Sequence, residues 1–388
     1  MAGSPLHVLI AGGGIAGLTS AIALRQRGIS STVFESVDRG YERGAGLMLG
    51  ANALEVLDRL QLFDAVRAQG HEARELGAWK INGEPLQLTT GEEWEKRYGR
   101  RTIVIHRNAL HRVLSGALEA DSVKYEKRVA GVVQNAERAS LKFEDGSEAE
   151  GDVIVGADGL YSTVRQALFG PTKYRYAGET SWRGISDHVI ASGPRAQSLA
   201  EIWGVQRGHR FGFGPISPRQ TYFFATAYTP AGGRDESPEA ALRSLRQSFA
   251  DFVPEVSELL RHTSPERLIR TDIFDFKPRR RWHTGRVVLV GDAAHATTPN
   301  LGQGACQAIE SAYVLAQELA SRAVPDAFVR YERIRMQKAH YVTRMSWRFG
   351  KIVDMPGPIG RWLRYSVLPR APKSSTFKQM DRIYRLNF

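Results

Sequence analysis

The stretch His7–Phe34, HVLIAGGGIAGLTSAIALRQRGISSTVF, decides the fold. His7–Ala11 is a short apolar run that predicts a buried parallel strand. Ile15–Gly28 is rich in Ala and Leu and predicts a helix, and Ser31–Phe34 predicts a second strand. The order strand, glycine loop, helix, strand is that of a βαβ unit.

The loop glycines have the spacing of a dinucleotide-binding turn. Gly12 permits the tight turn, Gly14 lets the backbone approach a pyrophosphate, and Gly17 lets the helix pack close to the strand. The helix N-terminus adds free N–H groups and the positive end of the dipole. Glu35, at the end of the second strand, can accept hydrogen bonds from ribose hydroxyls. We therefore predict a dinucleotide site; the alternative is a purely structural glycine turn.

A second segment, Asp152–Gly159, is a strand that ends in Asp-Gly. It places the carboxylate of Asp158 at the carboxyl edge of the predicted sheet, where ligands bind in such folds. The alternative is that Asp158, or Ser162 after it, only caps the helix that follows, in which Arg165 lies.

A third segment, Gly291-Asp-Ala-Ala-His295, follows another buried strand far along the chain. Its Asp292 can accept a hydrogen bond from a ribityl hydroxyl, which indicates a long dinucleotide, FAD. The residues Gly302, Gln303, Gly304 and Ala305 then open a predicted helix, Ala305–Ser321. That helix N-terminus suits the pyrimidine edge of a flavin, where negative charge develops on reduction.

Composition is that of an ordinary globular enzyme, with 42% hydrophobic and 24% charged residues among 388. One cysteine excludes an intrachain disulfide, and no spacing of ligands implies a metal. The chain goes almost directly into its first strand, so we expect no signal peptide, and a cytoplasmic protein. The net charge of +12 accompanies no nucleic-acid motif, so we expect a solvated basic surface and no nucleic-acid partner.

Taken together, the three segments resemble the signatures of the single-component, FAD-dependent aromatic hydroxylases, the para-hydroxybenzoate hydroxylase-like family. The resemblance implies a mixed α/β (α+β) fold: a Rossmann-like FAD-binding domain, an interleaved β-sheet substrate domain and C-terminal helices. It implies reduction of FAD by NADH or NADPH and transfer of one oxygen atom from O2 through a flavin C4a-hydroperoxide. We assign Ser36 and Val129 to the cofactor site as well. Arg107, which opens a predicted helix, is a candidate phosphate contact; the alternative is a surface arginine.

Within that family the chain is similar to the branch with salicylate, 3-hydroxybenzoate, urate and alkylquinolone hydroxylases. Arg210 and Tyr222 match substrate-contacting positions of the urate enzymes, and an aspartate of those enzymes is Asn300 here. The alternation of a strand puts Arg210, Gly212 and Gly214 on one face, which predicts space for a planar ring beside the arginine. In the alternative, Arg210 forms a surface ion pair and Tyr222 is a core residue.

The chain alternates between two predicted domains. We assign 1–72, 98–177 and 268–350 to FAD binding. We assign 73–97 and 178–267 to the substrate domain, the first as strands and a polar loop, and 351–388 to a C-terminal helical segment. His295 and Cys306 are expected to be buried packing residues. The aromatic and basic run Ile359–Tyr365 is expected to pack over the substrate domain, the alternative being contact with a membrane surface.

The sequence therefore predicts a monooxygenase of a planar aromatic or heteroaromatic substrate, monomeric or homodimeric and without stable membrane insertion. Two alternatives remain open. One is a flavin reductase or dehydrogenase that inserts no oxygen. The other is a flavin-binding protein without turnover.

Overall fold

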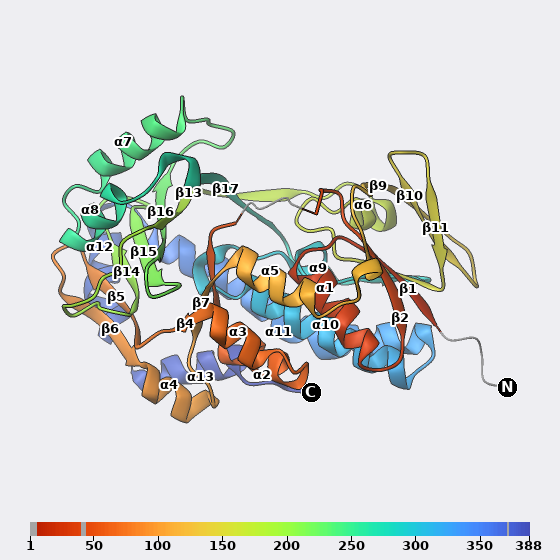
Figure 1. The fold of residues 1–388 in the computed structure, drawn as a ribbon. Coiled ribbons are helices and arrows are strands. Elements are labelled where there is room, and N and C mark those ends of the chain that lie inside the picture. Colours follow the sequence, from red (N-terminus) through yellow and green to blue (C-terminus); the bar gives the residue numbers. More distant parts are fainter. Residues whose placement is uncertain (1–5, 40–43, 371) are drawn as a thin grey trace.

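The computed structural model describes residues 6–39, 44–370 and 372–388, without the side chains of 373 and 375. The ribbon has two halves, one built on a mostly parallel sheet and one on a large, mostly antiparallel sheet (Figure 1). The long strands β13 (Tyr174–Ser186) and β17 (Ile269–Phe276) run from one half into the other.

The first half contains a six-stranded sheet that is parallel except at one edge, where β18 pairs antiparallel with β19. Its central strands are short and almost fully buried, as is usual for parallel strands inside a domain. In spatial order the strands are β18 (His283–Thr284), β19 (Val287–Leu289), β12 (Val153–Gly156), β1 (His7–Ala11), β2 (Ser30–Phe34) and β8 (Val123–Lys124). The three sequence segments thus supply three neighbouring strands, β19, β12 and β1.

Two helices far apart in sequence pack together against this sheet. α1 (Ile15–Arg25) is buried at every position from Ala16 to Leu24, and it lies against α10 (Gly304–Ser321). Shorter helices complete the layer: α2 (Ala51–Arg59), α3 (Phe63–Gln69), α5 (Arg107–Gly116), α6 (Thr163–Phe169) and α9 (Asp292–His295).

Two small antiparallel sheets flank the parallel one. One is a meander of β9 (Val129–Gln134), β10 (Ala139–Phe143) and β11 (Glu148–Gly151). The other joins β3 (Gly46–Leu49), β7 (Ile103–His106) and β4 (Gly70–Glu72), and it lies where the two halves meet, since β3 contacts β13.

The second half is a seven-stranded sheet with one apolar face. Phe211, Phe213 and Phe223 on that face pack under α7 (Pro238–Ser248) and α8 (Pro254–Arg261). In spatial order its strands are β17, β13, β16 (Thr221–Tyr228), β15 (Arg210–Pro215), β14 (Leu199–Trp203), β5 (Glu75–Lys80) and β6 (Pro85–Thr90). The opposite face of the sheet, with Arg210 and Tyr222, looks toward the first half.

Helices form the end of the chain. α11 (Val324–Val353) runs along the molecule, and α12 (Gly357–Trp362) and α13 (Lys373–Tyr384) follow it. A π-helical turn (Leu363–Val367) and a 3-10 turn (Leu368–Arg370) lie between the last two. In the part of the chain that is described, none of the helices combines the length and apolarity needed to cross a membrane.

One local prediction was wrong. The polar loop expected before residue 98 is instead the helix α4 (Gly91–Tyr98). Thr90 and Glu93 form a reciprocal capping box at its start: the Thr90 hydroxyl accepts from Glu93 N at 3.1 Å, and the Glu93 carboxylate accepts from Thr90 N at 3.1 Å. Trp94 is buried against Tyr98 and Tyr384, which gives this polar helix its packed side.

Candidate cofactor and substrate site

The glycine loop has the geometry that its spacing predicts. Gly12 has a φ of +104°, and its N–H donates to Phe34 O at 2.8 Å. A side chain at Gly17 would place Cβ 1.9 Å from Gly12 O, so only glycine lets α1 start this close to the loop. Gly14 faces open space, with no described atom within 4 Å of a built Cβ. The loop therefore leaves room for a ligand at Gly14 and none at Gly12 or Gly17.

Glu35 organises the chain beside the loop. One carboxylate oxygen accepts from Gly13 N at 2.7 Å. The other accepts from Ser36 N at 2.6 Å and Val37 N at 3.1 Å. Its backbone pairs with the segment that leads to Val129, since Lys127 N donates to Glu35 O at 2.8 Å. Glu35 and Ser36 thus lie beside the glycine loop, and the segment that leads to Val129 runs next to Glu35. A contact of these three residues with the cofactor stays a prediction.

Asp158 helps to cap the start of α6, which is the alternative role that the sequence offered. Its carboxylate accepts from Val164 N at 3.0 Å and from the Ser162 hydroxyl, which caps α6 by accepting from Arg165 N at 2.8 Å. Burial raises the pKa of Asp158, while these hydrogen bonds oppose the change. A cofactor contact of Asp158 stays a prediction.

Arg165, which the sequence placed only on a helix, ties the second segment to the third. Its fully buried guanidinium donates to Ala293 O at 3.0 Å and to Tyr174 Oη at 3.0 Å. It lies 4.5 Å from the ring centroid of Phe276. A buried, fully bonded arginine of this kind fixes the position of the residue beside Ala293, which is Asp292.

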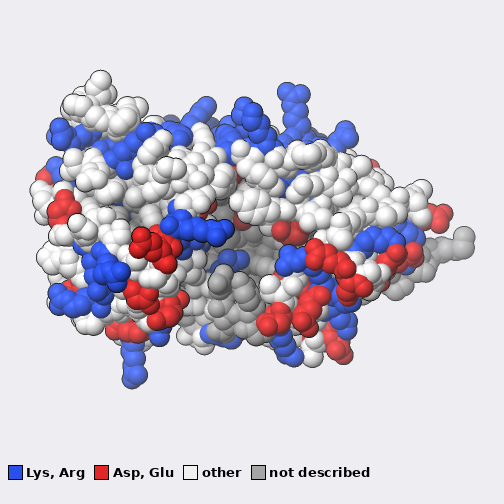
Figure 2. All heavy atoms as spheres, turned by 90° about the horizontal axis from the view of Figure 1, so that it is seen from above, with Lys and Arg blue, Asp and Glu red and all other residues white. Residues whose placement is uncertain are grey.

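Asp292 is solvent-accessible, although its neighbours Gly291 and Ala293 are buried. Surrounding protein nevertheless raises the pKa of its carboxyl group, and the charges of Arg107 and Arg165 oppose the shift. Figure 2, seen from above, shows the surface hollowed between the two halves of the molecule. Arg107 is exposed, and its positive charge acts on the carboxyl group of Asp292.

The start of α10 is open and polar. No side chain caps it, and its first turn carries no acid. Gly302, at φ +61°, lies against Met48 of β3, where any Cβ would meet the sulfur at 2.2 Å. Behind it, Gln303 Oε1 accepts from Asn52 Nδ2 at 3.0 Å. Buried Gln303 Nε2 and Asn52 Oδ1 have no hydrogen-bond partner among the described residues. The uncapped backbone amides at the start of α10, together with these unpartnered side-chain atoms, suit the polar edge of a ring bound at Gly304 and Ala305.

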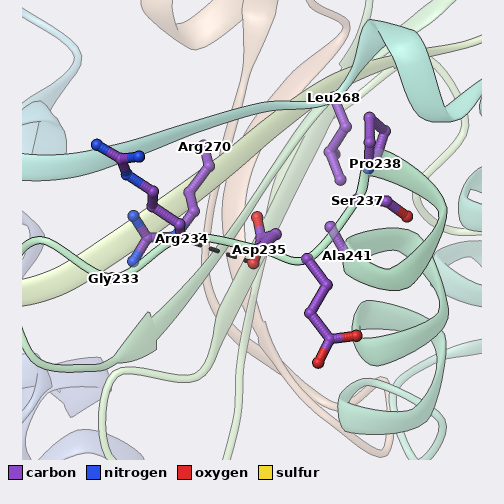
Figure 3. Close-up of a pocket in the computed structure, with 9 residues that line it drawn as sticks. Gly233, Arg234, Asp235, Ser237, Pro238, Ala241, Leu268 and Arg270 are labelled. Carbon is purple, nitrogen blue, oxygen red and sulfur yellow. Dashed lines mark ion pairs between the residues drawn. The ribbon is translucent and has the colours of Figure 1, made fainter.

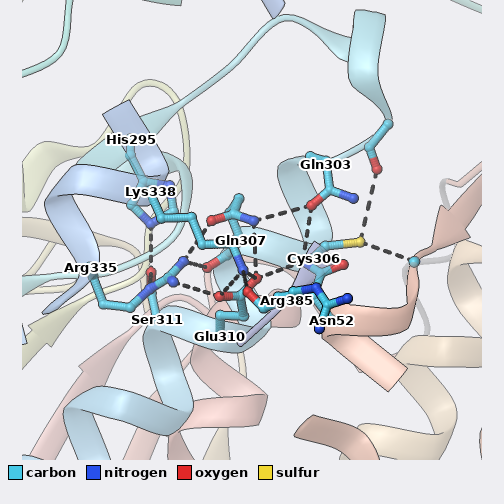
Figure 4. Close-up of polar contacts among 12 residues, drawn as sticks. Asn52, His295, Gln303, Cys306, Gln307, Glu310, Ser311, Arg335, Lys338 and Arg385 are labelled. Atoms are coloured by element: carbon cyan, nitrogen blue, oxygen red, sulfur yellow. Dashed lines mark hydrogen bonds and ion pairs between the residues drawn. The ribbon is translucent and has the colours of Figure 1, made fainter. Parts of the chain in front are cut away.

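A buried charged cluster lies one turn further into α10, and we call it the α10 cluster: Glu310, Arg335 and Lys338 (Figure 4). Glu310 pairs with Arg335 at 2.5 Å and with Lys338 at 2.8 Å, and all three side chains are at most 3% exposed. Although burial opposes ionisation, the two cations hold the pKa of Glu310 below its ordinary value. Asn52 also donates to Glu310, at 2.6 Å, so the cluster joins α2, α10 and α11.

His295 and Cys306 are buried packing residues, as expected. His295 shares a hydrogen bond of 2.8 Å with Ser311, and burial and Arg335 lower its pKa to about 3. Burial raises the pKa of the Cys306 thiol to about 12, so it is neither ionised nor reactive at neutral pH.

The expected substrate residue Arg210 is enclosed by carboxylates. It is 4% exposed and lies 3.1 Å from Glu179, 3.3 Å from Glu201 and 3.8 Å from Asp354. It also donates to Asn300 Oδ1 at 2.8 Å, in the loop that leads to α10. We call Arg210 and the three acids the β15 cluster. Arg210 is therefore neither a surface ion pair nor a free cation.

Tyr222 and the glycines of β15 lie differently from the prediction. Tyr222 packs on Gly46 of β3, where a Cβ would meet its ring at 2.2 Å. Burial raises its pKa to about 12, so its hydroxyl stays protonated, and it makes no hydrogen bond with a described residue. The space expected beside Gly212 is filled, because Phe224 pairs with it and its ring would lie 2.1 Å from a built Cβ. The predicted gap beside the arginine was wrong.

Two residues near the site were missed from the sequence. His111 on α5 lies 2.9 Å from Gly13 O through its Nε2 atom, so its imidazole supports the glycine loop. Arg335 on α11 anchors the α10 cluster. The sequence did contain a signal for these buried polar residues. Tyr331, Arg335 and Lys338 are spaced four and three residues apart, which places them on one face of the helix.

A surface groove of about 850 Å³ lies elsewhere, in the loop before α7 (Figure 3). Its charged groups face one another, with Arg270 Nε 4.0 Å from Asp235. None of the residues assigned to cofactor or substrate lines it. We assign no function to this groove.

Comparison with known proteins agrees with this geometry. A family model described as FAD binding domain matches residues 5–346. Aurachin C monooxygenase/isomerase of Stigmatella aurantiaca is 39% identical over 94% of each chain. The 2-heptyl-3-hydroxy-4(1H)-quinolone synthase of Pseudomonas aeruginosa is 30% identical over 98% of each.

The structure of Klebsiella pneumoniae HpxO complexed with FAD and uric acid superposes with a TM-score of 0.90. It is 29% identical, and the match covers 98% of this chain and 96% of that one. Because further relatives are named 3-amino-4-hydroxybenzoate 2-monooxygenase and FAD-dependent urate hydroxylase, a reductase without oxygen insertion and a flavin-binding protein without turnover are not favoured. The chain belongs to the FAD binding domain family and is an FAD-dependent aromatic monooxygenase.

Proposed function

We propose that this enzyme, with NADH or NADPH as reductant, hydroxylates a planar heteroaromatic substrate that carries no carboxylate. The observation that supports this proposal is the β15 cluster. Arg210 is already surrounded by Glu179, Glu201 and Asp354. A substrate carboxylate would have to enter a buried region with a formal excess of negative charge, which is strongly unfavourable.

The cofactor residues have distinct roles in this proposal. Gly12, Gly14 and Gly17 admit the pyrophosphate to the N-terminus of α1, and Glu35, Ser36 and Val129 border the adenosine end. Arg107 offers a cation, and Asp292 an acceptor for a hydroxyl of the ribityl chain. Gly302, Gln303, Gly304 and Ala305 hold the pyrimidine edge with backbone amides. When bound, FAD supplies the redox chemistry that activates oxygen. The location in the cytoplasm, the domain boundaries and a monomeric or homodimeric state stay predictions.

Tyr222 supplies the polar contact that Arg210 cannot. A protonated phenol without a partner is a hydrogen-bond donor, and it suits a carbonyl oxygen of the substrate. The face around it is apolar, with Val104, Ile185 and Ile216 in one cluster. A ring ketone such as a 4(1H)-quinolone satisfies both conditions. One relative is named for such a product, whereas salicylate and 3-hydroxybenzoate, substrates in the same branch, are carboxylates.

Matched compounds test the proposal. The purified holoenzyme would be given 2-heptyl-4(1H)-quinolone, its 6-carboxylic acid, in which C3 stays free to accept oxygen, and 3-hydroxybenzoate. Substrate-stimulated NAD(P)H oxidation and the oxygenated product would be measured by absorbance and mass spectrometry. We expect coupled turnover of the uncharged quinolone and at least about 100-fold lower kcat/KM for both acids, a difference of about 2.7 kcal/mol.

Two variants identify the cause of that discrimination. Glu201→Gln removes one negative charge of the β15 cluster and should reduce the difference in kcat/KM between the uncharged quinolone and the two acids. Glu144→Gln, which removes an exposed carboxylate 3.7 Å from Arg128, should leave it unchanged. Preferred turnover of a carboxylated arene by the unmodified enzyme would disprove the proposed substrate class.

A further inference from the structure

An exposed apolar surface lies on the C-terminal segment. Ile359 and Trp362 of α12 are 73% and 61% exposed, and Val367 in the π-helical turn is 38% exposed. A hollow of about 730 Å³ opens beside them and is lined by Trp362, Ser366, Val367, Leu368 and Arg370. Isolated exposed apolar residues are common, but three within nine residues of sequence beside an open hollow form a patch.

The same segment is strongly basic. Residues 355–380 contain five Lys or Arg and no Asp or Glu. Arg361 and Arg370 are exposed beside the apolar residues. We call Ile359, Arg361, Trp362, Val367 and Arg370 the C-terminal patch. A tryptophan beside arginines on one surface is the combination found at the interface between water and lipid headgroups.

The patch is held rigidly on the substrate half. Arg364, which is buried, donates to Val353 O at 2.7 Å and Met355 O at 2.8 Å. Tyr365 donates to Trp203 O at 2.8 Å, and Trp203 is the residue paired with Arg210 between β14 and β15. The segment therefore packs over the substrate domain, as the sequence predicted, and its other side remains open.

We propose that the C-terminal patch docks this enzyme onto the surface of an anionic membrane. Ile359, Trp362 and Val367 enter the headgroup layer, while Arg361 and Arg370 pair with lipid phosphates. Charge decides the kind of membrane, because a segment with five basic and no acidic residues gains little from zwitterionic lipid and much from anionic lipid. The docking is peripheral and reversible, because three apolar side chains bury far less surface than a spanning helix.

The test uses the full-length holoenzyme and sedimentation with vesicles. Vesicles of pure phosphatidylcholine would be compared with vesicles containing equal parts of phosphatidylcholine and phosphatidylglycerol. We expect co-sedimentation with the anionic vesicles, at least about 10-fold weaker partition with the zwitterionic ones, and release by added salt. No binding to anionic vesicles would overturn the proposal.

The double variant Ile359→Asp/Trp362→Asp should lower partition to anionic vesicles by at least about 10-fold. Its matched control is Val133→Asp/Val329→Asp, which adds the same charge at two other exposed apolar residues, 55% and 57% exposed. The control should partition like the unmodified enzyme. Equal loss in both variants, or no loss in either, would show binding by the general basic surface and overturn the patch. FAD content and thermal unfolding confirm that each variant is folded.

Discussion

The α10 cluster and the β15 cluster are both buried, yet their charges are opposite. In the first, two cations, Arg335 and Lys338, surround the single carboxylate of Glu310. In the second, three carboxylates surround the single cation of Arg210. The first lies behind the expected flavin edge, where negative charge develops, and the second lies on the substrate face. The two halves thus offer a positive environment to the cofactor and a negative one to the substrate.

The difference also shows in protonation. The two cations keep Glu310 ionised, with a pKa below its ordinary value. In the β15 cluster, burial raises the pKa of Asp354 to about 7, with Arg210 opposing the shift and Glu179 adding to it. Burial likewise raises the pKa of Glu201. The α10 cluster therefore keeps its carboxylate ionised, whereas the β15 cluster can reduce its negative charge by binding protons.

The largest expected effect on stability is in the α10 cluster. Glu310→Gln leaves two buried cations without a carboxylate and should lower the free energy of unfolding by about 3–5 kcal/mol. Urea unfolding of the holoenzyme measures it. The control is Glu55→Gln, because Glu55 also pairs with two arginines, Arg59 and Arg100, but is 42% exposed. It should cost no more than about 1 kcal/mol. Similar losses in both variants would show that burial does not distinguish these carboxylates.

A smaller and pH-dependent effect is expected in the other cluster. Arg210→Met removes the cation, and the remaining acids respond by binding protons, so the loss should be about 1–3 kcal/mol near pH 6. It should grow toward pH 8, where keeping the acids protonated costs more. Unfolding by urea at both pH values measures this. A loss independent of pH would mean that Glu201 and Asp354 do not exchange protons when Arg210 is removed.

The most local effect concerns Asp354 alone. Its folded pKa of about 7 lies above the ordinary 3.8, so the folded protein holds the extra proton between these values. Its contribution to stability is complete below pH 4 and is lost as the pH rises through about 7. Relative to Asp354→Asn, the unmodified protein should lose stability over this range with a slope of at most about 1.4 kcal/mol per pH unit. Parallel pH profiles of the two proteins would contradict the raised pKa.

The sequence was sufficient where short-range geometry decides the structure. The spacing of Gly12, Gly14 and Gly17 fixes a turn, and its strand and helix follow within a few residues. It was insufficient where the pairing of distant strands decides. Gly212 faces Phe224 because β15 and β16 pair in one register, which no local pattern reveals.

The charges around Arg210 illustrate the same limit. The three acids lie on β13, on β14 and at the end of α11, so only the assembled sheet brings them to one arginine. The missed helix α4 is a different case, since Thr90 and Glu93 already form the capping-box pattern in the sequence. That element could have been predicted, whereas the β15 cluster could not.

The packing of α1 against α10 has a consequence for synthesis of the chain on the ribosome. α1 is buried at every position from Ala16 to Leu24, and the helix that covers it begins at Gly304. Translation of the intervening chain takes roughly 15–60 s at typical rates of elongation, and throughout that time the face of α1 that α10 covers lacks that partner. The cofactor-binding half cannot complete its core until the third segment has left the ribosome, so the nascent chain leaves this apolar face incompletely covered for most of its synthesis.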